Sequence, residues 1–315
     1  MFSSEEEFLT FLDSFFPKDH SSLDIPRGDD CAVLKIEGDI CVSTDLFLED
    51  VHFKLDYFSP EDIGYKALAV NISDICAMGA TPEGFFLNLI FPHKIMDKNF
   101  WNGVFYGMSS LSNSLEMVLA GGYISKGPML GFGITVWGRG KRYLKRQAEV
   151  GDLIFVTGEL GLARVGLMVL ENYPELITEF PESVNRFLRP PILLKEANTL
   201  ALYEGVRSLM DVSDGLIKDL KRLVGPEKGV RLFSDSLDIH EEVKRFSSLT
   251  KEEPLKYFLL GGEDYALLGT LDRNRIDVSK VQIGISIIGE VIPRSGIWIG
   301  NNMIKFDGYD HFSKR

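Results

Sequence analysis

Hydrophobic and polar residues alternate along the first half of the chain in blocks that predict helices and strands in turn. Residues 5–16 have the pattern of an amphipathic helix that packs on the core or on a partner subunit. Further helices are expected over 60–80 and 100–115, and strands over 31–36, 39–45, 83–91, 117–122 and 131–140. Gly121 and Gly122 predict a tight turn where the strand over 117–122 ends. The alternation favours an α/β or α+β fold.

The second half of the chain repeats one pattern, in which an apolar strand is followed by a glycine-rich turn and a helix. The pattern occurs over 153–170 and again over 207–224, and Gly261-Gly262 interrupts a third apolar stretch over 256–271. Residues 296–306 predict a hairpin. The polar segment 140–152 predicts a boundary between two domains, 1–140 and 141–315.

Composition narrows the class of protein. The chain of 315 residues has a formal net charge of −12, which argues against nucleic acid as a partner because binding its phosphates needs clustered Lys and Arg. No apolar stretch reaches the length of a membrane span, so no membrane partner is expected. The three cysteines lack CxxC spacing and are expected to be buried, reduced thiols of a cytoplasmic protein.

Acidic residues at the ends of predicted strands and the starts of predicted helices are the main candidates for chemistry. The GxxxxGK[ST], GxSxG and HExxH motifs are absent. Taken singly, each acid has an ordinary interpretation: Asp214 as the N-cap of a helix, Asp29 and Asp45 in Asx turns. Acids that converged would repel one another. Hard oxygen ligands without His or Cys suit Mg²⁺, which in turn suits a nucleotide polyphosphate.

Seven stretches of the sequence carry a resemblance to a known family. In chain order they are GDDCAVL (28–34), STDLFLEDVHF (43–53), GYKALAVNISDICAMGATP (64–82), FLRP (187–190), DVSDGLIKDL (211–220), GGEDYALL (261–268) and GYDHF (308–312). Together they resemble the thiamine-monophosphate kinases, within the superfamily of aminoimidazole ribonucleotide synthetase, selenophosphate synthetase and a hydrogenase-maturation factor. VHF and the terminal GYDHF favour the thiamine-monophosphate kinase branch.

The resemblance implies an enzyme that phosphorylates thiamine monophosphate to thiamine diphosphate, with ATP as co-substrate and several Mg²⁺ ions. It also implies two α/β domains. The N-terminal domain has a mixed sheet with flanking helices, binds ATP and Mg²⁺ and pairs in a homodimer. The C-terminal domain, also with a mixed sheet, completes the active site.

The resemblance also assigns roles by position. The metal ligands that it implies are Asp30, Ser43, Thr44, Asp45, Asp74, Asp211 and Asp214. The ATP contacts are Gly122, Tyr123, Arg146 and Ser213, and the substrate contacts are His52, Glu263 and Tyr309. Ordinary alternatives remain open for three of these: His52 as a half-buried histidine, Tyr309 as a packing residue and Arg146 as a solvated linker residue.

The absence of a general base agrees with the implied reaction. The attacking phosphate oxygen of thiamine monophosphate is already ionised near neutral pH, so no base is needed to create the nucleophile. The difficulty lies in bringing two anionic phosphates together, which depends on positioning and charge neutralisation. A site rich in Asp and poor in His suits that task.

Tyr123 departs from the family pattern, which has GGD or GGN where this chain has GGY. The usual aspartate would bind one Mg²⁺ together with Thr44 and Asp45, and a neutral phenol is a poor Mg²⁺ ligand. Three accounts stay open. The remaining acids hold enough metal; or Tyr123 impairs the site and leaves an ATP-binding homologue; or Tyr123 is a substitution in an otherwise ordinary enzyme. A related enzyme acting on another substrate is a further alternative.

Overall fold

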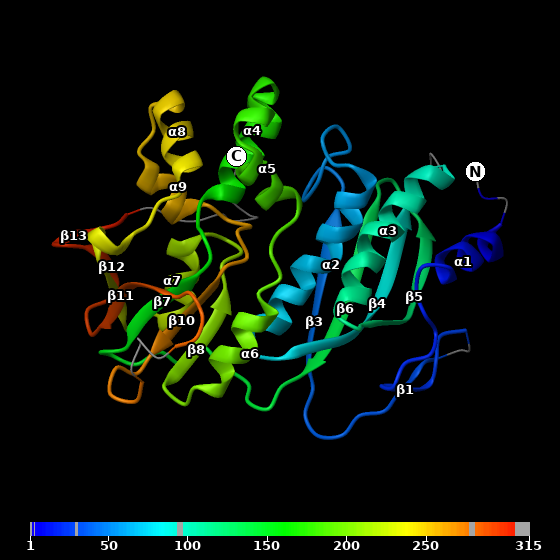
Figure 1. The fold of residues 1–315 in the computed structure, drawn as a ribbon, viewed down its shortest axis with the longest axis horizontal. Coiled ribbons are helices and arrows are strands. Elements are labelled where there is room, and N and C mark those ends of the chain that lie inside the picture. Colours follow the sequence, from blue (N-terminus) through cyan, green and yellow to red (C-terminus); the bar gives the residue numbers. More distant parts are fainter. Residues whose placement is uncertain (1, 3, 29–30, 93–96, 277–280, 306–315) are drawn as a thin grey trace. The chain divides into compact units, whose positions relative to one another are not determined.

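The computed structural model describes residues 2, 4–28, 31–92, 97–276 and 281–305. It divides into two compact units (Figure 1): unit 1 holds 1–75 and 81–140, and unit 2 holds 76–80 and 141–315. Each unit has its own mixed sheet. Among the described residues, no helix has the length and apolar character needed to cross a membrane.

Unit 1 is built on a four-stranded sheet in the order β3-β6-β4-β5. Its strands are β3 (Cys41–Leu48), β4 (Thr81–Phe91), β5 (Val118–Lys126) and β6 (Gly131–Arg139). The β4–β5 pair is parallel and the others are antiparallel. Helices α2 (Pro60–Ala77) and α3 (Lys98–Ser114) cover one face (Figure 1). Helix α1 (Glu5–Asp13) joins them through Phe8, whose ring centroid lies 5.2 Å from that of Trp101.

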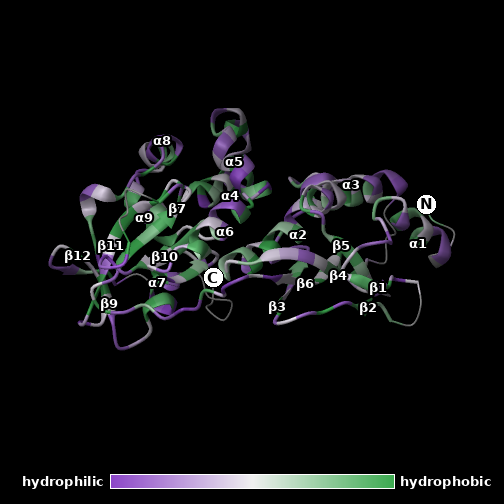
Figure 2. Ribbon diagram, turned by 60° about the horizontal axis from the view of Figure 1, so that its bottom comes forward, coloured by the Kyte–Doolittle hydropathy of each residue, from purple (hydrophilic) through white to green (hydrophobic). Residues whose placement is uncertain are grey.

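The other face of this sheet is only partly covered (Figure 2). A two-stranded sheet of β1 (Leu23–Ile25) and β2 (Val33–Leu34) packs there against Trp137. Three large side chains of the same face remain in solvent: Val42 and Leu46 of β3 are 57% and 58% exposed, and Tyr123 of β5 is 70% exposed. The structure therefore leaves an apolar strip on the uncovered side of unit 1.

Three expectations for unit 1 are wrong. The strand expected over 31–36 is only two residues long and pairs with β1, and Cys31 before it is exposed rather than buried. Gly121 and Gly122 lie inside β5 and form no turn. A Cβ on Gly122 would lie 1.8 Å from the carbonyl oxygen of Leu87 on β4, so glycine is needed there for close approach of two strands.

Unit 2 contains a seven-stranded sheet in the order β13-β12-β9-β11-β7-β10-β8. Its strands are β7 (Leu153–Thr157), β8 (Val206–Asp211), β9 (Gly229–Leu232), β10 (Leu267–Leu271), β11 (Ser286–Ile292), β12 (Gly296–Ile299) and β13 (Asn302–Met303). Among the described strands of this sheet, only β9 and β12 pair in parallel. The predicted hairpin is present as β12–β13.

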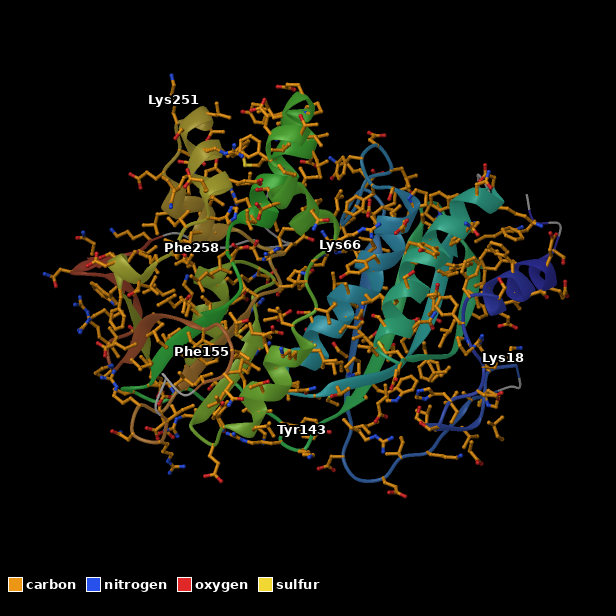
Figure 3. The ribbon with its side chains drawn as sticks, in the orientation of Figure 1. Lys18, Lys66, Tyr143, Phe155, Lys251 and Phe258 are labelled. Atoms are coloured by element: carbon orange, nitrogen blue, oxygen red, sulfur yellow. The ribbon has the colours of Figure 1, made fainter. Side chains whose placement is uncertain are left out.

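The helices of unit 2 complete its core. They are α4 (Leu162–Asn172), α5 (Pro181–Leu188), α6 (Leu194–Leu202), α7 (Leu216–Val224), α8 (Glu241–Thr250) and α9 (Pro254–Leu260), with short 3-10 turns at Pro174–Glu179 and Ser234–Ser236. Phe258 of α9 packs with Ile154 and Val156 of β7 in one cluster. Because side chains alternate along β7, Phe155, which is labelled in Figure 3, lies on the opposite face, and it is also fully buried. Both faces of this sheet are therefore apolar.

Candidate functional site

Strand β3 and helix α2 bring four polar side chains together in unit 1. The Ser43 hydroxyl donates to Asp74 Oδ2 at 2.5 Å. The Asp45 backbone N–H donates to Asn71 Oδ1 at 3.1 Å, and the Asn71 amide in turn donates to the carbonyl of Ala67. Asn71 and Asp74 are three residues apart on α2, so both reach the strand from one side of the helix. The helix thereby fixes the position of Ser43 and Asp45.

The carboxylates of Asp45 and Asp74 in this cluster repel each other. Partial burial, and then the nearby negative charge of Asp74, raise the pKa of Asp45 to about 6. The donor set consists of a hydroxyl and two carboxylates, which are the oxygen ligands that Mg²⁺ prefers. A divalent cation beside Asp45 and Asp74 would offset their repulsion. The chemistry of these residues therefore fits a magnesium ion.

Thr44 and Tyr123 occupy the uncovered face of the same sheet. The Thr44 hydroxyl contacts Thr135 Oγ1 at 3.0 Å and donates to the carbonyl of Ile134. Tyr123 stands on β5, two strands beyond β6, so about 14 Å of sheet separates β3 from β5. By strand register, Asp45 points to the opposite face from Tyr123. Position 123 and Asp45 therefore do not converge within one copy of the chain.

His52 follows β3 in the loop before α2. Its ring stacks on Phe47 at 6.0 Å between centroids, and its Nδ1 accepts the backbone N–H of Leu48 at 3.0 Å. Because Nδ1 accepts, the neutral ring carries its proton on Nε2. The loop therefore fixes both the orientation and the tautomer of His52.

The strand register of unit 2 gathers three loops at one end of its sheet. Leu267, which begins β10, pairs with Thr157 at the end of β7 and with Asp211 at the end of β8. The loops 158–161, 212–215 and 261–265 therefore meet at this end. The backbone N–H of Glu263 donates to the carbonyl of Ser213 at 2.9 Å. The predicted site residues of unit 2 on these two loops are thus neighbours.

The two predicted metal ligands of this loop cluster differ in surroundings. Asp211 is buried at the end of β8. Asp214 is half-buried and forms ion pairs with Arg222 at 2.6 Å and Lys218 at 3.2 Å. Both cations would compete with a metal for the Asp214 carboxylate. The oxygen donors of Asp214 therefore fit a metal less well than the Asp45–Asp74 cluster does.

Two fully buried carboxylates support the loop cluster. Asp219 of α7 accepts the backbone N–H groups of Ser213 and Asp214, and burial raises its pKa to about 6. Asp264 accepts the backbone N–H groups of Gly161 and Ala163 at the start of α4, and burial raises its pKa to about 7. Neither was predicted as a site residue. Their positions within the stretches DVSDGLIKDL and GGEDYALL could have indicated that they belong to the site.

The remaining predicted residues lie apart or outside the described part. Arg146 is exposed between β6 and β7, one residue before Gln147, whose N–H donates to Ser208. Asp30 and Tyr309 lie outside the described residues. Within the residues that are described, no three His, Cys, Asp or Glu side chains form a metal-binding group. The predicted ligands are instead divided between the two units.

Comparisons with known proteins identify the family of this chain. The family "AIR synthase related protein, N-terminal domain" matches residues 28–139. The thiamine-monophosphate kinase of Bacillus subtilis is 33% identical over 93% of this chain and 95% of its own. The chain belongs to the thiamine-monophosphate kinase family.

Two solved structures have the same fold as this member of the thiamine-monophosphate kinase family. The thiamine-monophosphate kinase of Stenotrophomonas maltophilia superposes with a TM-score of 0.81 at 25% identity, covering 94% of this chain and 96% of that one. AaThiL complexed with AMPPCP and TMP superposes with a TM-score of 0.76 at 25% identity, covering 98% and 97%. The mixed α/β architecture with one mixed sheet in each unit is therefore that of the family.

Proposed function

We infer that this chain transfers the γ-phosphoryl group of ATP to the phosphate of thiamine monophosphate, giving thiamine diphosphate and ADP. The family membership over almost the entire chain carries this conclusion. A phosphate oxygen of thiamine monophosphate forms a bond to the γ-phosphorus of ATP, and the bond from that phosphorus to the β–γ bridging oxygen breaks. The attacking oxygen is already ionised, so no side chain has to remove a proton.

The polar residues of both units would divide the work of binding. Mg²⁺, when bound, neutralises the phosphate charges that approach one another. Its proposed ligands are Asp30, Ser43, Thr44, Asp45, Asp74, Asp211 and Asp214. The hydrogen bonds that β3 donates to helix α2, from the Asp45 N–H to Asn71 and from Ser43 to Asp74, support the unit 1 ligands, because they hold these groups in fixed positions before metal binds.

The nucleotide and the substrate would contact a second group of residues. For ATP these are Gly122, Tyr123, Arg146 and Ser213, and for thiamine monophosphate His52, Glu263 and Tyr309. The fixed tautomer of His52 supports its role, since it presents an N–H donor at Nε2. The bond between the Glu263 and Ser213 backbones supports placing nucleotide and substrate contacts on adjoining loops.

A homodimer formed through the N-terminal domain, 1–140, belongs to the proposal. Val42 and Leu46 give the uncovered sheet face an apolar strip that a second copy would bury. Thr44 and Tyr123 share this face from opposite edges of the sheet. A pairing that sets β5 of one copy beside β3 of its partner would bring these two positions together. The C-terminal domain, 141–315, would contribute the loop cluster.

The test is to incubate the chain with ATP, Mg²⁺ and thiamine monophosphate and to quantify thiamine diphosphate by chromatography. We expect product from the natural sequence and a loss of about tenfold or more in kcat/KM for Asp74→Asn, which removes one charge from the unit 1 cluster. Asp56→Asn, an exposed acid of the same unit, is the matched control and should keep full activity. No product at high enzyme concentration would refute the proposed function.

A further inference from the structure

The three loops of unit 2 touch one another through their backbones, without a layer of side chains between them. A Cβ on Gly262 would lie 2.7 Å from the carbonyl oxygen of Ser213, and a Cβ on Gly261 would lie 3.0 Å from the Cα of Gly161. Glycine is therefore required at these contacts. These contacts set how closely the loops approach one another, because no flexible side chain lies between them.

Asp264 connects the loop 261–265 to the loop 158–161 and the start of α4. Its Oδ2 accepts the backbone N–H of Gly161 at 2.6 Å, and its Oδ1 accepts that of Ala163 at 2.8 Å. The residues on either side, Glu263 and Tyr265, have φ values of +64° and +48°, a conformation that non-glycine residues rarely adopt. Two left-handed residues turn Asp264 inward and are held there by its two hydrogen bonds.

Asp219, which lies on helix α7, connects that helix to the loop 212–215. One of its oxygens, Oδ2, accepts the backbone N–H of both Ser213 and Asp214 at 3.1 Å. The other, Oδ1, accepts from Arg222 at 2.9 Å. Both N–H groups belong to the two residues before Gly215, the N-cap of helix α7. The backbone position of Ser213 and Asp214 therefore depends on Asp219.

We propose that Asp219 and Asp264 are positioning residues of the active site: Asp219 sets the place of Ser213 and Asp214, and Asp264 sets the place of Glu263. Neither carboxylate touches a reacting atom in this proposal. Each acts through the backbone of a loop that carries proposed nucleotide or substrate contacts. The inference rests on the proposed kinase activity, which the experiment below tests separately.

The hydrogen-bond geometry predicts that replacing each aspartate with asparagine has a different effect at the two positions. In Asp219→Asn, the single amide oxygen can accept both backbone N–H groups, and the amide NH₂ then faces Arg222, which lies outside the loop and keeps its ion pair with Asp214. In Asp264→Asn, only one of the two N–H groups can be accepted, and the amide NH₂ faces the other. Asparagine should therefore preserve function at position 219 and impair it at position 264. Alanine should impair function at both.

Asp152→Asn is the matched control for loss of a buried carboxylate. Asp152 is 3% exposed, accepts the backbone N–H of Glu149 and pairs with Arg207. It precedes β7 at the end of the sheet opposite the loop cluster, where Leu153 pairs with Leu271. Its loss should lower stability without moving the loops. It thus separates general destabilisation from displacement of the loops.

Steady-state kinetics with both substrates varied, together with thermal melts, test the proposal at about pH 8. We expect Asp264→Asn to raise KM for thiamine monophosphate about tenfold and to leave KM for ATP within about twofold. Asp219→Ala should raise KM for ATP about tenfold, whereas Asp219→Asn should stay within about threefold of the natural sequence. Asp152→Asn should change neither KM.

Two results would overturn the proposal. One is a folded Asp264→Asn enzyme with both KM values unchanged. The other is a uniform fall in kcat for the Asp152, Asp219 and Asp264 variants with no change in KM, which would assign all three a structural role. If the natural sequence makes no thiamine diphosphate, the proposed function fails on its own. Calorimetry with ATP then decides whether Asp219→Ala weakens nucleotide binding more than Asp152→Asn does.

Discussion

Asp264→Asn should change how the stability of the protein depends on pH. The Asp264 carboxyl is fully buried, and that burial raises its pKa from 3.8 to about 7. The two backbone N–H groups and the charge of Arg186 favour its ionised form, and the charge of Glu263 opposes it. Between these pKa values the folded protein holds a proton that the unfolded chain has released. The free energy of unfolding therefore falls as the pH rises through this range.

The size of this effect follows from the two pKa values. Each pH unit between them costs about 1.4 kcal/mol, because one proton is released on unfolding. From about pH 5 to about pH 8, the contribution of Asp264 should fall by about 2.5 kcal/mol and then become flat. Asparagine has no proton to exchange. The difference in unfolding free energy between the natural sequence and Asp264→Asn should therefore fall by this amount.

Urea unfolding at a series of pH values measures this difference, followed by tryptophan fluorescence and circular dichroism. The test is how this difference in unfolding free energy changes with pH. The hydrogen bond that asparagine loses changes the difference by the same amount at every pH. Glu175→Gln removes an exposed carboxylate of the same unit and should follow the natural sequence at every pH. A difference that stays constant from about pH 5 to about pH 8 would mean that Asp264 remains ionised throughout, and would refute the reasoning.

Three further changes test other parts of the structure. Tyr123→Asp should raise activity at limiting Mg²⁺, because a carboxylate is a better Mg²⁺ ligand than a phenol; Mg²⁺ titrations of the rate measure it. Gly122→Ala should lower the free energy of unfolding by roughly 3 kcal/mol, because its Cβ would meet the carbonyl oxygen of Leu87 at 1.8 Å; urea unfolding measures it. Leu46→Asp should convert the proposed dimer to monomers, because it puts a charge in the apolar strip; sedimentation measures the mass.

Each of these changes has a control and a contrary outcome. Tyr123→Phe should not raise activity, and an unchanged Mg²⁺ dependence for Tyr123→Asp would remove position 123 from the metal site. Gly284→Ala, where no atom lies within 4 Å of the added Cβ, should leave stability unchanged. Leu249→Asp changes a residue of unit 2 that is 59% exposed and should leave the mass unchanged. A natural chain that sediments as a monomer contradicts the proposed dimer.

The elements with strong local signals were predictable from the sequence. Helix α2 begins at Pro60, and Gly79 (φ +71°), two residues beyond its last residue, donates its N–H to Cys76, as the stop signal indicated. The strand–turn–helix pattern at Asp211 and its counterpart after Thr157 are also present. In these segments periodicity, caps and glycines agree with one another, so local information suffices.

The glycine pair in β5 shows where local information fails. Gly121-Gly122 predicts a turn because glycine reaches conformations that other residues avoid. In the structure the same pair lies within a strand, and Gly122 is needed for close approach to Leu87. Both requirements select glycine, and the sequence does not distinguish them. Only the pairing of β4 with β5, which are separated by helix α3, decides between the two.

Glu263 and Asp264 show the same limit within the candidate site. In the sequence they are adjacent acids with equal claims to bind a ligand. In the structure Asp264 is fully buried and Glu263 is only partly buried, because left-handed residues on both sides of Asp264 turn it toward the start of α4. A buried carboxylate needs donors, and here these are backbone N–H groups about a hundred residues earlier in the chain. The positions of the backbone N–H groups therefore decide which of the two acids stabilises the loop and which is left to bind a ligand. Those positions are known only once the fold is known.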